Sequence, residues 1–187
     1  MINLIKKISE AYGPSGREED IRSIIEEEVK DKVDETIVDS LGNLIAVKKG
    51  KGKKIMIAAH MDEIGIIITH FDKEGFLRFS TIGGVSPYTL LGKRFVFSQG
   101  VFGTVGIEKS KNIKSLSINK MYVDIGAEDK EEAMEKVSIG DFGVYESNLV
   151  QCGKRLSGKA FDDRVGCALL IKALEDLSTI NEIYFVF

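Results

Sequence analysis

Ile55-Met56-Ile57-Ala58-Ala59-His60-Met61-Asp62 is an apolar run that ends in a histidine and an aspartate two residues apart. A short apolar run of this kind predicts a strand. Because alternate side chains of a strand point to the same side, His60 and Asp62 are expected to lie next to each other. The Asp62 carboxylate can then accept a hydrogen bond from one ring nitrogen of His60, which leaves the other nitrogen free to bind a metal ion. The alternative is a strand-end histidine that is held by a neighbouring carboxylate and binds no metal.

A second acidic motif follows far downstream, at Phe161-Asp162-Asp163-Arg164-Val165-Gly166. Together with His60, it predicts a site assembled from distant parts of the chain. Asp162 and Asp163 have an alternative interpretation, because carboxylates in the first turn of a helix are stabilised by the positive end of the helix dipole. The residues alone favour that interpretation over metal binding. Arg164 is expected to pair with a nearby carboxylate.

The composition is typical of a folded globular protein. The chain of 187 residues can form one medium domain or two small ones, and 43% of its residues are hydrophobic and 29% charged. No apolar stretch has the length of a membrane span, and the N-terminus lacks the order of a secretory signal. We therefore expect a cytoplasmic protein without a membrane partner. The abundance of lysine and glutamate over glutamine is weakly indicative of a thermophilic source.

Charge and cysteine content argue against several classes of function. The formal net charge of −3 gives no reason to expect a nucleic-acid partner. The lysine- and glycine-rich segment 48–54 lacks aromatic residues that would stack on bases, and it is expected to form a solvated hairpin turn. The two cysteines, Cys152 and Cys167, form no C-x-x-C pattern, so neither a zinc ribbon nor a disulfide framework is predicted.

Two amphipathic helices and three strands are predicted before residue 60. The helices are separated by the break Gly13-Pro14-Ser15-Gly16, after which Ser15 and Glu18 have the spacing of a capping box, with Ser15 as the cap of the second helix. The strands are expected at 36–38, 44–47 and 55–59. Apolar residues recur at helical spacing on both sides of the break: Leu4, Ile5, Ile8, Ile21, Ile24, Ile25 and Val29.

Between about residues 64 and 150 the chain consists of short apolar pieces punctuated by glycines. This pattern predicts a small β-barrel or β-sandwich with a helix or two. One helix is expected at Lys130–Val137, with Asp129 as its cap. His70 lies beside a predicted hairpin turn and is expected at the surface.

After Gly158 the chain returns to an α/β pattern. An apolar helix is predicted to end near Asp176, followed by a buried strand at 182–187. Because α/β sheets cover such strands with further helices, we expect this chain to be the N-terminal portion of a longer protein.

Five motifs, in this order, resemble those of the glutamyl/leucyl metallo-aminopeptidases that assemble into tetrahedral dodecamers, often called TET aminopeptidases. Some members of that family have also been labelled endoglucanase or cellulase. The match covers about the first half of a family member. The motifs are Gly13-Pro14-Ser15-Gly16-Arg17-Glu18, Asp39-Ser40-Leu41-Gly42-Asn43, Ala59-His60-Met61-Asp62-Glu63-Ile64-Gly65, Val123-Asp124-Ile125-Gly126-Ala127 and Gly158-Lys159-Ala160-Phe161-Asp162-Asp163-Arg164.

The resemblance implies a particular domain organisation. An α/β/α catalytic domain of the phosphorylase/hydrolase-like type, present here only in its N-terminal part, would be interrupted by a β-rich PDZ-like dimerisation domain. The catalytic domain would occupy residues 1–66 and 157–187, and the PDZ-like domain residues 67–156. Peptides would be the substrates, and the protein would associate with itself, from dimers to a tetrahedral dodecamer.

The resemblance also implies a site with two divalent metal ions, zinc or cobalt. His60 would bind one ion, Asp162 would bridge both, and Asp62 would orient His60. Asp163 would bind no metal itself but would support the residues that do, and a cis peptide bond would join it to the bridging residue Asp162. Two such ions polarise a scissile carbonyl and acidify a water molecule. The family's glutamate pair, its later aspartate and its C-terminal histidine have no counterpart here, so the 187-residue chain alone is expected to be inactive.

Two other functions are weighed against the aminopeptidase. A glycoside hydrolase would need two carboxyl groups about 5–9.5 Å apart that flank one bond. Asp162 and Asp163 are adjacent and would diverge, and Asp62 is expected to be paired to His60, so this function is disfavoured. A non-catalytic assembly or peptide-binding module, with a vestigial metal motif, is the third hypothesis.

Overall fold

The computed structural model describes residues 1–108 and 116–187, which form two compact units. The first, here called the α/β unit, consists of residues 1–62 and 147–187, and the second, the barrel unit, of residues 63–146. The unit boundaries therefore fall earlier in the chain than residues 66 and 156, where the resemblance places the domain boundaries. Among the described residues, no helix has both the length and the apolarity needed to cross a bilayer.

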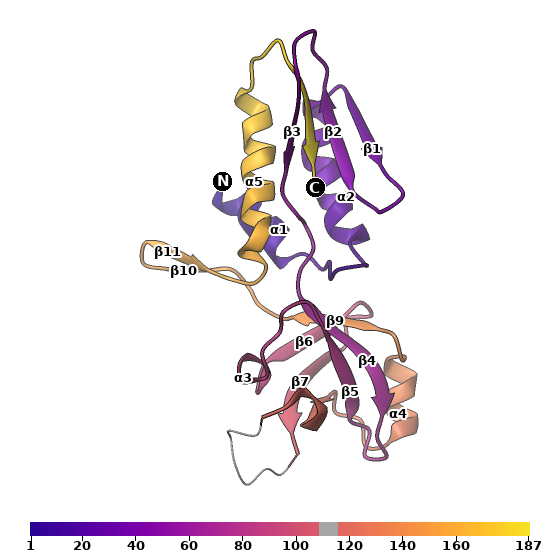
Figure 1. Cartoon of the computed structure of the whole chain (residues 1–187). Coiled ribbons are helices and arrows are strands. Elements are labelled where there is room, and N and C mark those ends of the chain that lie inside the picture. The colour runs from indigo at the N-terminus through magenta and orange to yellow at the C-terminus, as the bar shows by residue number, and fades with distance from the viewer. Residues whose placement is uncertain (109–115) are drawn as a thin grey trace. The chain divides into compact units, whose positions relative to one another are not determined.

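The α/β unit contains a four-stranded mixed sheet (Figure 1). Its strands are β1 (Glu35–Val38), β2 (Leu44–Lys48), β12 (Glu182–Val186) and β3 (Lys54–Ala58), in the spatial order β1-β2-β12-β3. β12 runs antiparallel to β2 and parallel to β3, so that Phe185 is paired with Ala46 on one side and Ile57 on the other. The strands predicted at residues 36–38, 44–47, 55–59 and 182–187 are therefore all present, with ends that differ by at most one residue.

The hairpin predicted at residues 48–54 is wrong, because β12 lies between β2 and β3. The segment instead packs on the loop that leads into β12. The amides of Lys51 and Gly52 donate to the Ile180 carbonyl at 2.9 and 2.7 Å. A Cβ atom on Gly50 would lie 2.3 Å from the backbone of Asn181, so only glycine permits this approach.

Helices α1 (Ile2–Glu10), α2 (Glu19–Val29) and α5 (Phe161–Asp176) pack on the sheet and form the core of the unit (Figure 1). A short 3-10 turn, η1 (Lys30–Lys32), follows α2, and a hairpin of β10 (Val150–Cys152) and β11 (Arg155–Ser157) precedes α5. Fully buried core side chains come from every layer, and each contributes about 1.5–3 kcal/mol of burial free energy. They include Ile8, Ile21, Ile25, Val29, Leu44, Ile171 and Phe185.

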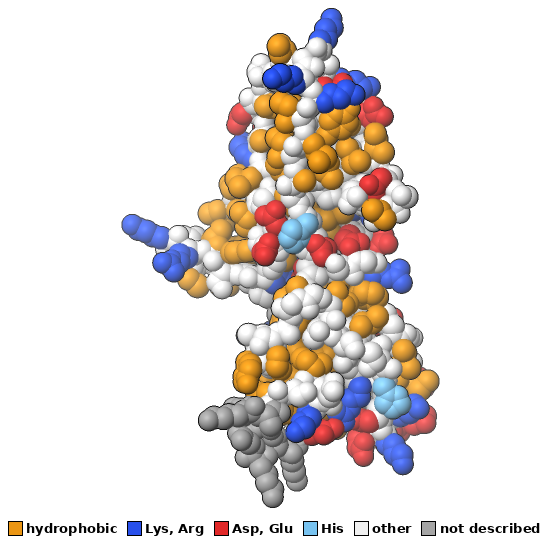
Figure 2. Space-filling model, in the orientation of Figure 1, with side chains coloured by type: hydrophobic (Ala, Val, Ile, Leu, Met, Phe, Trp, Pro, Cys, Tyr) orange, Lys and Arg blue, Asp and Glu red, His pale blue; other side chains and the backbone are white. Residues whose placement is uncertain are grey.

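Other apolar side chains of the sheet stay exposed. Met56 of β3 is 72% exposed, and Ile37 of β1 is 42% exposed. Figure 2 shows apolar side chains spread over this part of the α/β unit. Every residue of β3 is exposed, in contrast to its neighbour β12, which buries Ile183 and Phe185.

The predicted capping box is wrong. α2 begins at Glu19, and Glu18 at the preceding position makes no side-chain cap. Ser15 lies in a turn in which the amide of Arg17 donates to the Pro14 carbonyl. That turn keeps the Ser15 hydroxyl away from the helix, and it donates to Asp62 instead.

The barrel unit is a closed six-stranded barrel, one of the two architectures that the sequence predicts. Every neighbouring pair of strands is antiparallel, and the six pairings together close the barrel. The strands, in order around the barrel, are β4 (Gly65–Phe71), β5 (Leu77–Ile82), β8 (Met121–Asp124), β7 (Phe102–Ile107), β6 (Arg94–Phe97) and β9 (Phe142–Tyr145).

The barrel has its own core and short helical segments. Buried side chains alternate along the strands, as for Ile66 and Ile68 of β4 and Phe95 and Phe97 of β6. The helical segments are α3 (Pro87–Leu90), η3 (Ile118–Lys120) and α4 (Lys130–Lys136). The predicted cap of α4 is confirmed, because the Asp129 carboxylate accepts a hydrogen bond from the Glu132 amide at 2.9 Å. His70 is exposed, as predicted.

Candidate functional site

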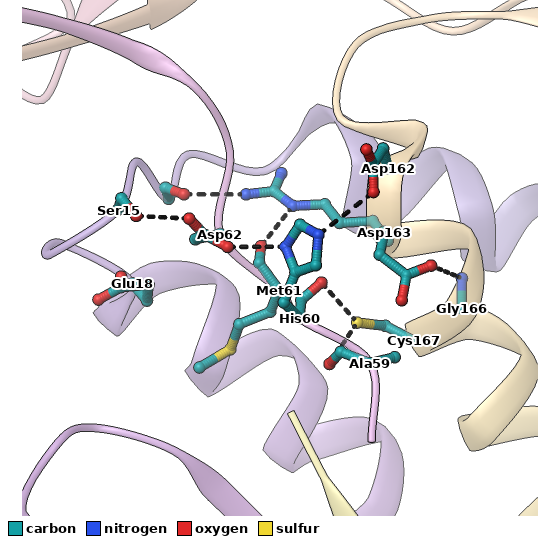
Figure 3. Close-up of polar contacts among 12 residues, drawn as sticks. Ser15, Glu18, Ala59, His60, Met61, Asp62, Asp162, Asp163, Gly166 and Cys167 are labelled. Atoms are coloured by element: carbon teal, nitrogen blue, oxygen red, sulfur yellow. Dashed lines mark hydrogen bonds and ion pairs between the residues drawn. The ribbon is translucent and has the colours of Figure 1, made fainter. Parts of the chain in front are cut away.

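His60 and Asp62 lie just beyond the end of β3 (Figure 3). The Ala59 amide donates to the Val186 carbonyl, so the pairing with β12 continues to the residue before His60. His60 Nδ1 is 2.7 Å from Asp62 Oδ1. The structure thus brings the two side chains together as their spacing predicts. This contact leaves Nε2 of His60 as the nitrogen that faces away from Asp62.

Asp162 faces that free nitrogen from the start of α5. Its Oδ1 is 3.2 Å from His60 Nε2, and its side chain is 98% exposed. The two residues are far apart in sequence, and the structure places their side chains in direct contact (Figure 3). A ring nitrogen and a carboxylate oxygen therefore meet at one point of the surface.

Asp163 turns the other way, into the helix. Its Oδ1 accepts a hydrogen bond from the Gly166 amide at 3.2 Å, as expected for a carboxylate at a helix N-terminus. The Asp162–Asp163 peptide bond is cis, as the resemblance implies. Asp162 and Asp163 both have non-helical backbone angles, so the regular part of α5 begins after them. Of the two interpretations of this motif, the helix N-terminus thus describes Asp163, whereas Asp162 faces His60.

Arg164 ties the parts of the site together. Its side chain is fully buried, and its Nε donates to the Met61 carbonyl at 2.8 Å. The same guanidinium donates to the carbonyls of Ile8, Ala11 and Gly13 at 2.9, 2.6 and 3.3 Å. These hydrogen bonds offset the cost of burying a charge. One side chain of α5 thereby fixes the backbone between His60 and Asp62 and the segment after α1. The sequence gives no signal for this role, because backbone carbonyls carry no sequence signature.

Cys167 supports the same backbone from the next turn of α5. Its thiol lies 3.5 Å from the Ala59 carbonyl and 3.4 Å from the His60 carbonyl. Burial, with a smaller contribution from the negative charge of Asp163, raises the pKa of Cys167 to about 12. The thiol therefore keeps its proton and acts as a weak donor, which makes a nucleophilic role unsuitable.

Opposing effects act on the pKa of His60. Partial burial lowers it, but the hydrogen bonds to the carboxylates of Asp62 and Asp162 raise it by more, so the net pKa lies above the ordinary value. The two carboxylates thus stabilise the cationic form of the imidazole. A metal ion between Nε2 and Asp162 would take the place of that proton.

A small cavity adjoins His60 in the α/β unit. Its volume is about 100 Å³, and it is lined by His60, Asp62, Glu18, Asn43 and Phe187, among others. The loop beside it is ordered by Asp39, whose carboxylate accepts hydrogen bonds from the amides of Leu41 and Asn43. The cavity is large enough for a few water molecules.

The donor set fits part of a metal site. Imidazole nitrogen and carboxylate oxygen are the ligands that zinc and cobalt accept. A catalytic zinc site needs three protein ligands, however. Within residues 1–108 and 116–187, no group of three or more histidine, cysteine, aspartate or glutamate side chains is placed to hold an ion. His60 and Asp162 therefore fit as a portion of a ligand set.

Comparison with known proteins identifies relatives over the whole chain. The family model for M42 glutamyl aminopeptidase matches residues 42–187. A provisionally named aminopeptidase of Acetivibrio thermocellus is 54% identical over 100% of this chain and 57% of its own length. A lysyl aminopeptidase of Pyrococcus furiosus is 38% identical over 98% of this chain and 57% of its own length. The chain thus spans a little over half the length of these curated relatives.

Solved structures agree with the sequence matches. An aminopeptidase of Desulfurococcus kamchatkensis superposes with a TM-score of 0.94 at 39% identity, over 99% of this chain and 54% of that one. A Pyrococcus horikoshii TET1 peptidase, described as assembling into a tetrahedron or a large octahedral shell, has a TM-score of 0.89 at 37% identity, over 100% and 60%. A Thermotoga maritima protein described as an endoglucanase has a TM-score of 0.89 at 36% identity, over 98% and 58%.

The family resemblance inferred from the five motifs is therefore confirmed, including the endoglucanase label that some members carry. The mixed α/β fold is shared with these neighbours. The chain belongs to the M42 glutamyl aminopeptidase family.

Proposed function

We propose that the protein containing this chain is a metal-dependent aminopeptidase, which removes N-terminal residues from peptides. The observation that carries the proposal is the contact of His60 Nε2 with Asp162, two potential ligands from distant segments that meet in a chain of an aminopeptidase family. The names of the relatives specify different N-terminal residues. The family is named for glutamyl residues, and the Pyrococcus furiosus protein is named for lysyl residues. The proposal therefore specifies the reaction and leaves the N-terminal residue preference open.

Each residue of the site has a separate task in this proposal. His60 would hold one divalent ion through Nε2, and Asp162 would bridge it to a second ion. Asp62 would orient His60, and Asp163 would anchor the bridging residue to the N-terminus of α5. When bound, the two ions, zinc or cobalt, would supply Lewis-acid activation of the scissile carbonyl and of a water molecule. The remaining ligands and the general base would come from a segment of the full-length protein that corresponds to the part of the relatives not matched by this chain.

We also propose that the protein acts as a self-assembled particle in the cytoplasm. The Pyrococcus horikoshii relative is described as forming tetrahedral or octahedral shells. The barrel unit, closed and equipped with its own core, is the candidate PDZ-like dimerisation module. Dimers made through it would build a tetrahedral dodecamer.

Metal removal and restoration test the aminopeptidase in the full-length protein. Cleavage of aminoacyl-p-nitroanilides should stop on treatment with a chelator and return on addition of zinc or cobalt. His60→Ala should lower the bound metal, measured by elemental analysis, and abolish most of the activity. His70→Ala, at the exposed histidine of the barrel unit, is the matched control and should change neither. Cleavage that persists without metal would contradict the proposal, and a protein that binds metal but cleaves no peptide would favour the assembly module.

The glycoside hydrolase remains the second candidate, because one similar structure is described as an endoglucanase. The geometry disfavours it. Asp62 contacts both His60 and Ser15, and Asp163 is bound to its own helix, so Asp162 has no second free carboxylate beside it in this motif. Hydrolysis of cellulose that is insensitive to chelator would support this function over the peptidase.

A further inference from the structure

The turn Pro14–Arg17 holds its second residue, Ser15, in a fixed place in the α/β unit. The Arg17 amide donates to the Pro14 carbonyl at 2.8 Å. Gly16 has a φ of +87°, which a type II turn requires at its third position. The Glu18 carboxylate accepts a hydrogen bond from the Gly16 amide, and this contact closes the turn from the other side. These contacts are independent of Asp62.

The segment before this turn is also fixed. The Gly13 carbonyl accepts a hydrogen bond from Nη2 of the buried Arg164. A Cβ atom on Gly13 would lie 2.4 Å from the Ile21 side chain, so the backbone is packed against α2. The turn is therefore anchored to α2 and α5, the same two helices that border the site.

From this turn the Ser15 hydroxyl reaches the carboxylate of Asp62 (Figure 3). It donates to Oδ2, at a distance of 2.5 Å, while Oδ1 of the same carboxylate lies 2.7 Å from His60 Nδ1. Both oxygens of Asp62 are thus engaged, from opposite sides. The terminal torsion of an aspartate is broad when one contact holds it, and a second contact from a fixed donor confines it.

We propose that Ser15 is a positioning residue of the candidate site, which fixes the ring orientation and the tautomer of His60 through Asp62. The neutral imidazole would carry its proton on Nδ1, where Asp62 accepts it, and present the lone pair of Nε2 toward Asp162. The hydrogen-bonded chain Ser15–Asp62–His60 does not depend on any metal. Its purpose, the presentation of Nε2 to an ion, rests on the proposed function.

The tautomer of His60 is the direct readout of this role. The chain has only two histidines, so ¹⁵N-labelled imidazole signals can be assigned to His60 and His70 with a single His70→Gln variant. At a pH high enough that the His60 ring signals no longer change with pH, long-range ¹H–¹⁵N correlations report which nitrogen carries the proton. The 187-residue chain should show His60 predominantly in the Nδ1–H form. Ser15→Ala should increase the Nε2–H form, and Ser15→Thr, which keeps the hydroxyl, should restore the original spectrum.

A matched control separates positioning from a general effect of losing a serine. Ser23 is exposed on α2, and Ser23→Ala should leave the His60 signals unchanged. Backbone amide spectra of all variants establish that the fold is intact. An Nε2–H tautomer in the parent chain, or a Ser15→Ala spectrum identical to the parent, would overturn the proposal.

Zinc affinity of the full-length protein connects this role to the metal. Loss of a side chain that hydrogen-bonds to a metal-binding residue typically lowers the metal affinity by about 10–100-fold. We therefore expect Asp62→Asn to weaken zinc binding by that amount. Ser15→Ala acts one contact further out and should weaken it by roughly 3–10-fold, with recovery in Ser15→Thr. An unchanged zinc affinity in Ser15→Ala would overturn the link to the metal. If the protein binds no metal at all, the proposed function fails, and the tautomer measurement still decides whether Ser15 positions His60.

Discussion

Arg164 determines more of the site than any other single residue. Its guanidinium is fully buried and donates to carbonyls of five residues, which lie in α1, in the segment after α1 and between His60 and Asp62. A guanidinium has five donors in a planar arrangement, whereas a lysine ammonium has three on a flexible stem. Lysine therefore cannot reproduce these contacts, although it keeps the charge.

We expect Arg164→Lys to lower the free energy of unfolding by about 3 kcal/mol, because buried carbonyls lose their donors at a cost of about 1–3 kcal/mol each. Urea unfolding monitored by circular dichroism measures the change. Arg155→Lys, at an exposed position in β11, is the control and should change the value by less than about 0.5 kcal/mol. Equal stability of the two variants would show that Arg164 is not needed to hold these segments.

The two cysteines should differ sharply in reactivity. The pKa of Cys167 is raised to about 12, so its thiol keeps its proton to a higher pH than an ordinary cysteine does, and it is also buried. At about pH 8, iodoacetamide should modify the exposed Cys152 and leave Cys167 intact, as measured by peptide mass spectrometry. Unfolding in urea should make both reactive, and native Cys152→Ser should stay unmodified. Native Cys167 that reacts as fast as Cys152 would contradict this account.

At the scale of elements, periodicity predicts most of the secondary structure. The helical and extended patterns locate the three long helices and the four sheet strands of the α/β unit, and Asp129 marks the start of α4 as predicted. The failures have a common physical cause, which is competition from a distant segment. Ser15 has a capping-box spacing, but its hydroxyl donates a hydrogen bond to the distant Asp62. The segment between β2 and β3 forms no hairpin, because β12 lies between these two strands.

The same limit applies to the candidate site. The two-residue spacing of His60 and Asp62 is a local property of the chain, so their contact can be predicted from strand geometry. The two motifs by themselves suggest a shared site, but only the family resemblance favours metal binding over a helix N-terminus for Asp162. The hydrogen bonds of Arg164 and Ser15 join segments whose proximity exists only in the fold, and no residue pattern near either one indicates it.

Strands β7 and β8 approach closely at Gly103. A Cβ atom there would lie 2.4 Å from Val123 Cγ1 and 2.9 Å from Ile125, and Val123 is fully buried. Gly103→Ala should therefore destabilise the barrel by about 1–3 kcal/mol through overpacking. Thermal unfolding measures the loss. Gly84→Ala, where an added Cβ meets nothing within 4 Å, should be neutral, and equal melting temperatures for the two variants would refute the close approach.

At the scale of the molecule, the chain consists of two units with separate cores. The barrel unit is continuous in sequence, from residue 63 to residue 146, whereas the α/β unit is made of two segments. Each of its six strands is paired with two other strands of the same unit. The barrel unit therefore meets the requirements of an independently folding domain.

Residues 63–146 expressed alone should fold and unfold cooperatively. A single thermal transition, with dispersed amide signals in the ¹H–¹⁵N spectrum, is the expected result. Phe95→Ala, which removes a fully buried ring, should lower the stability of the fragment by about 3–5 kcal/mol and abolish or strongly shift that transition. A fragment with a collapsed, featureless spectrum would mean that the α/β unit is needed to hold the barrel together.

The position of β12 between β2 and β3 also has a consequence for synthesis on the ribosome. β2 and β3 emerge early, yet neither can gain its central neighbour until residues 182–186 have been translated. The complete sequence of the barrel precedes that moment. We therefore expect the barrel unit to fold on the nascent chain before the sheet of the α/β unit is complete. Until β12 is translated, β3 has no strand to join it to the pair of β1 and β2.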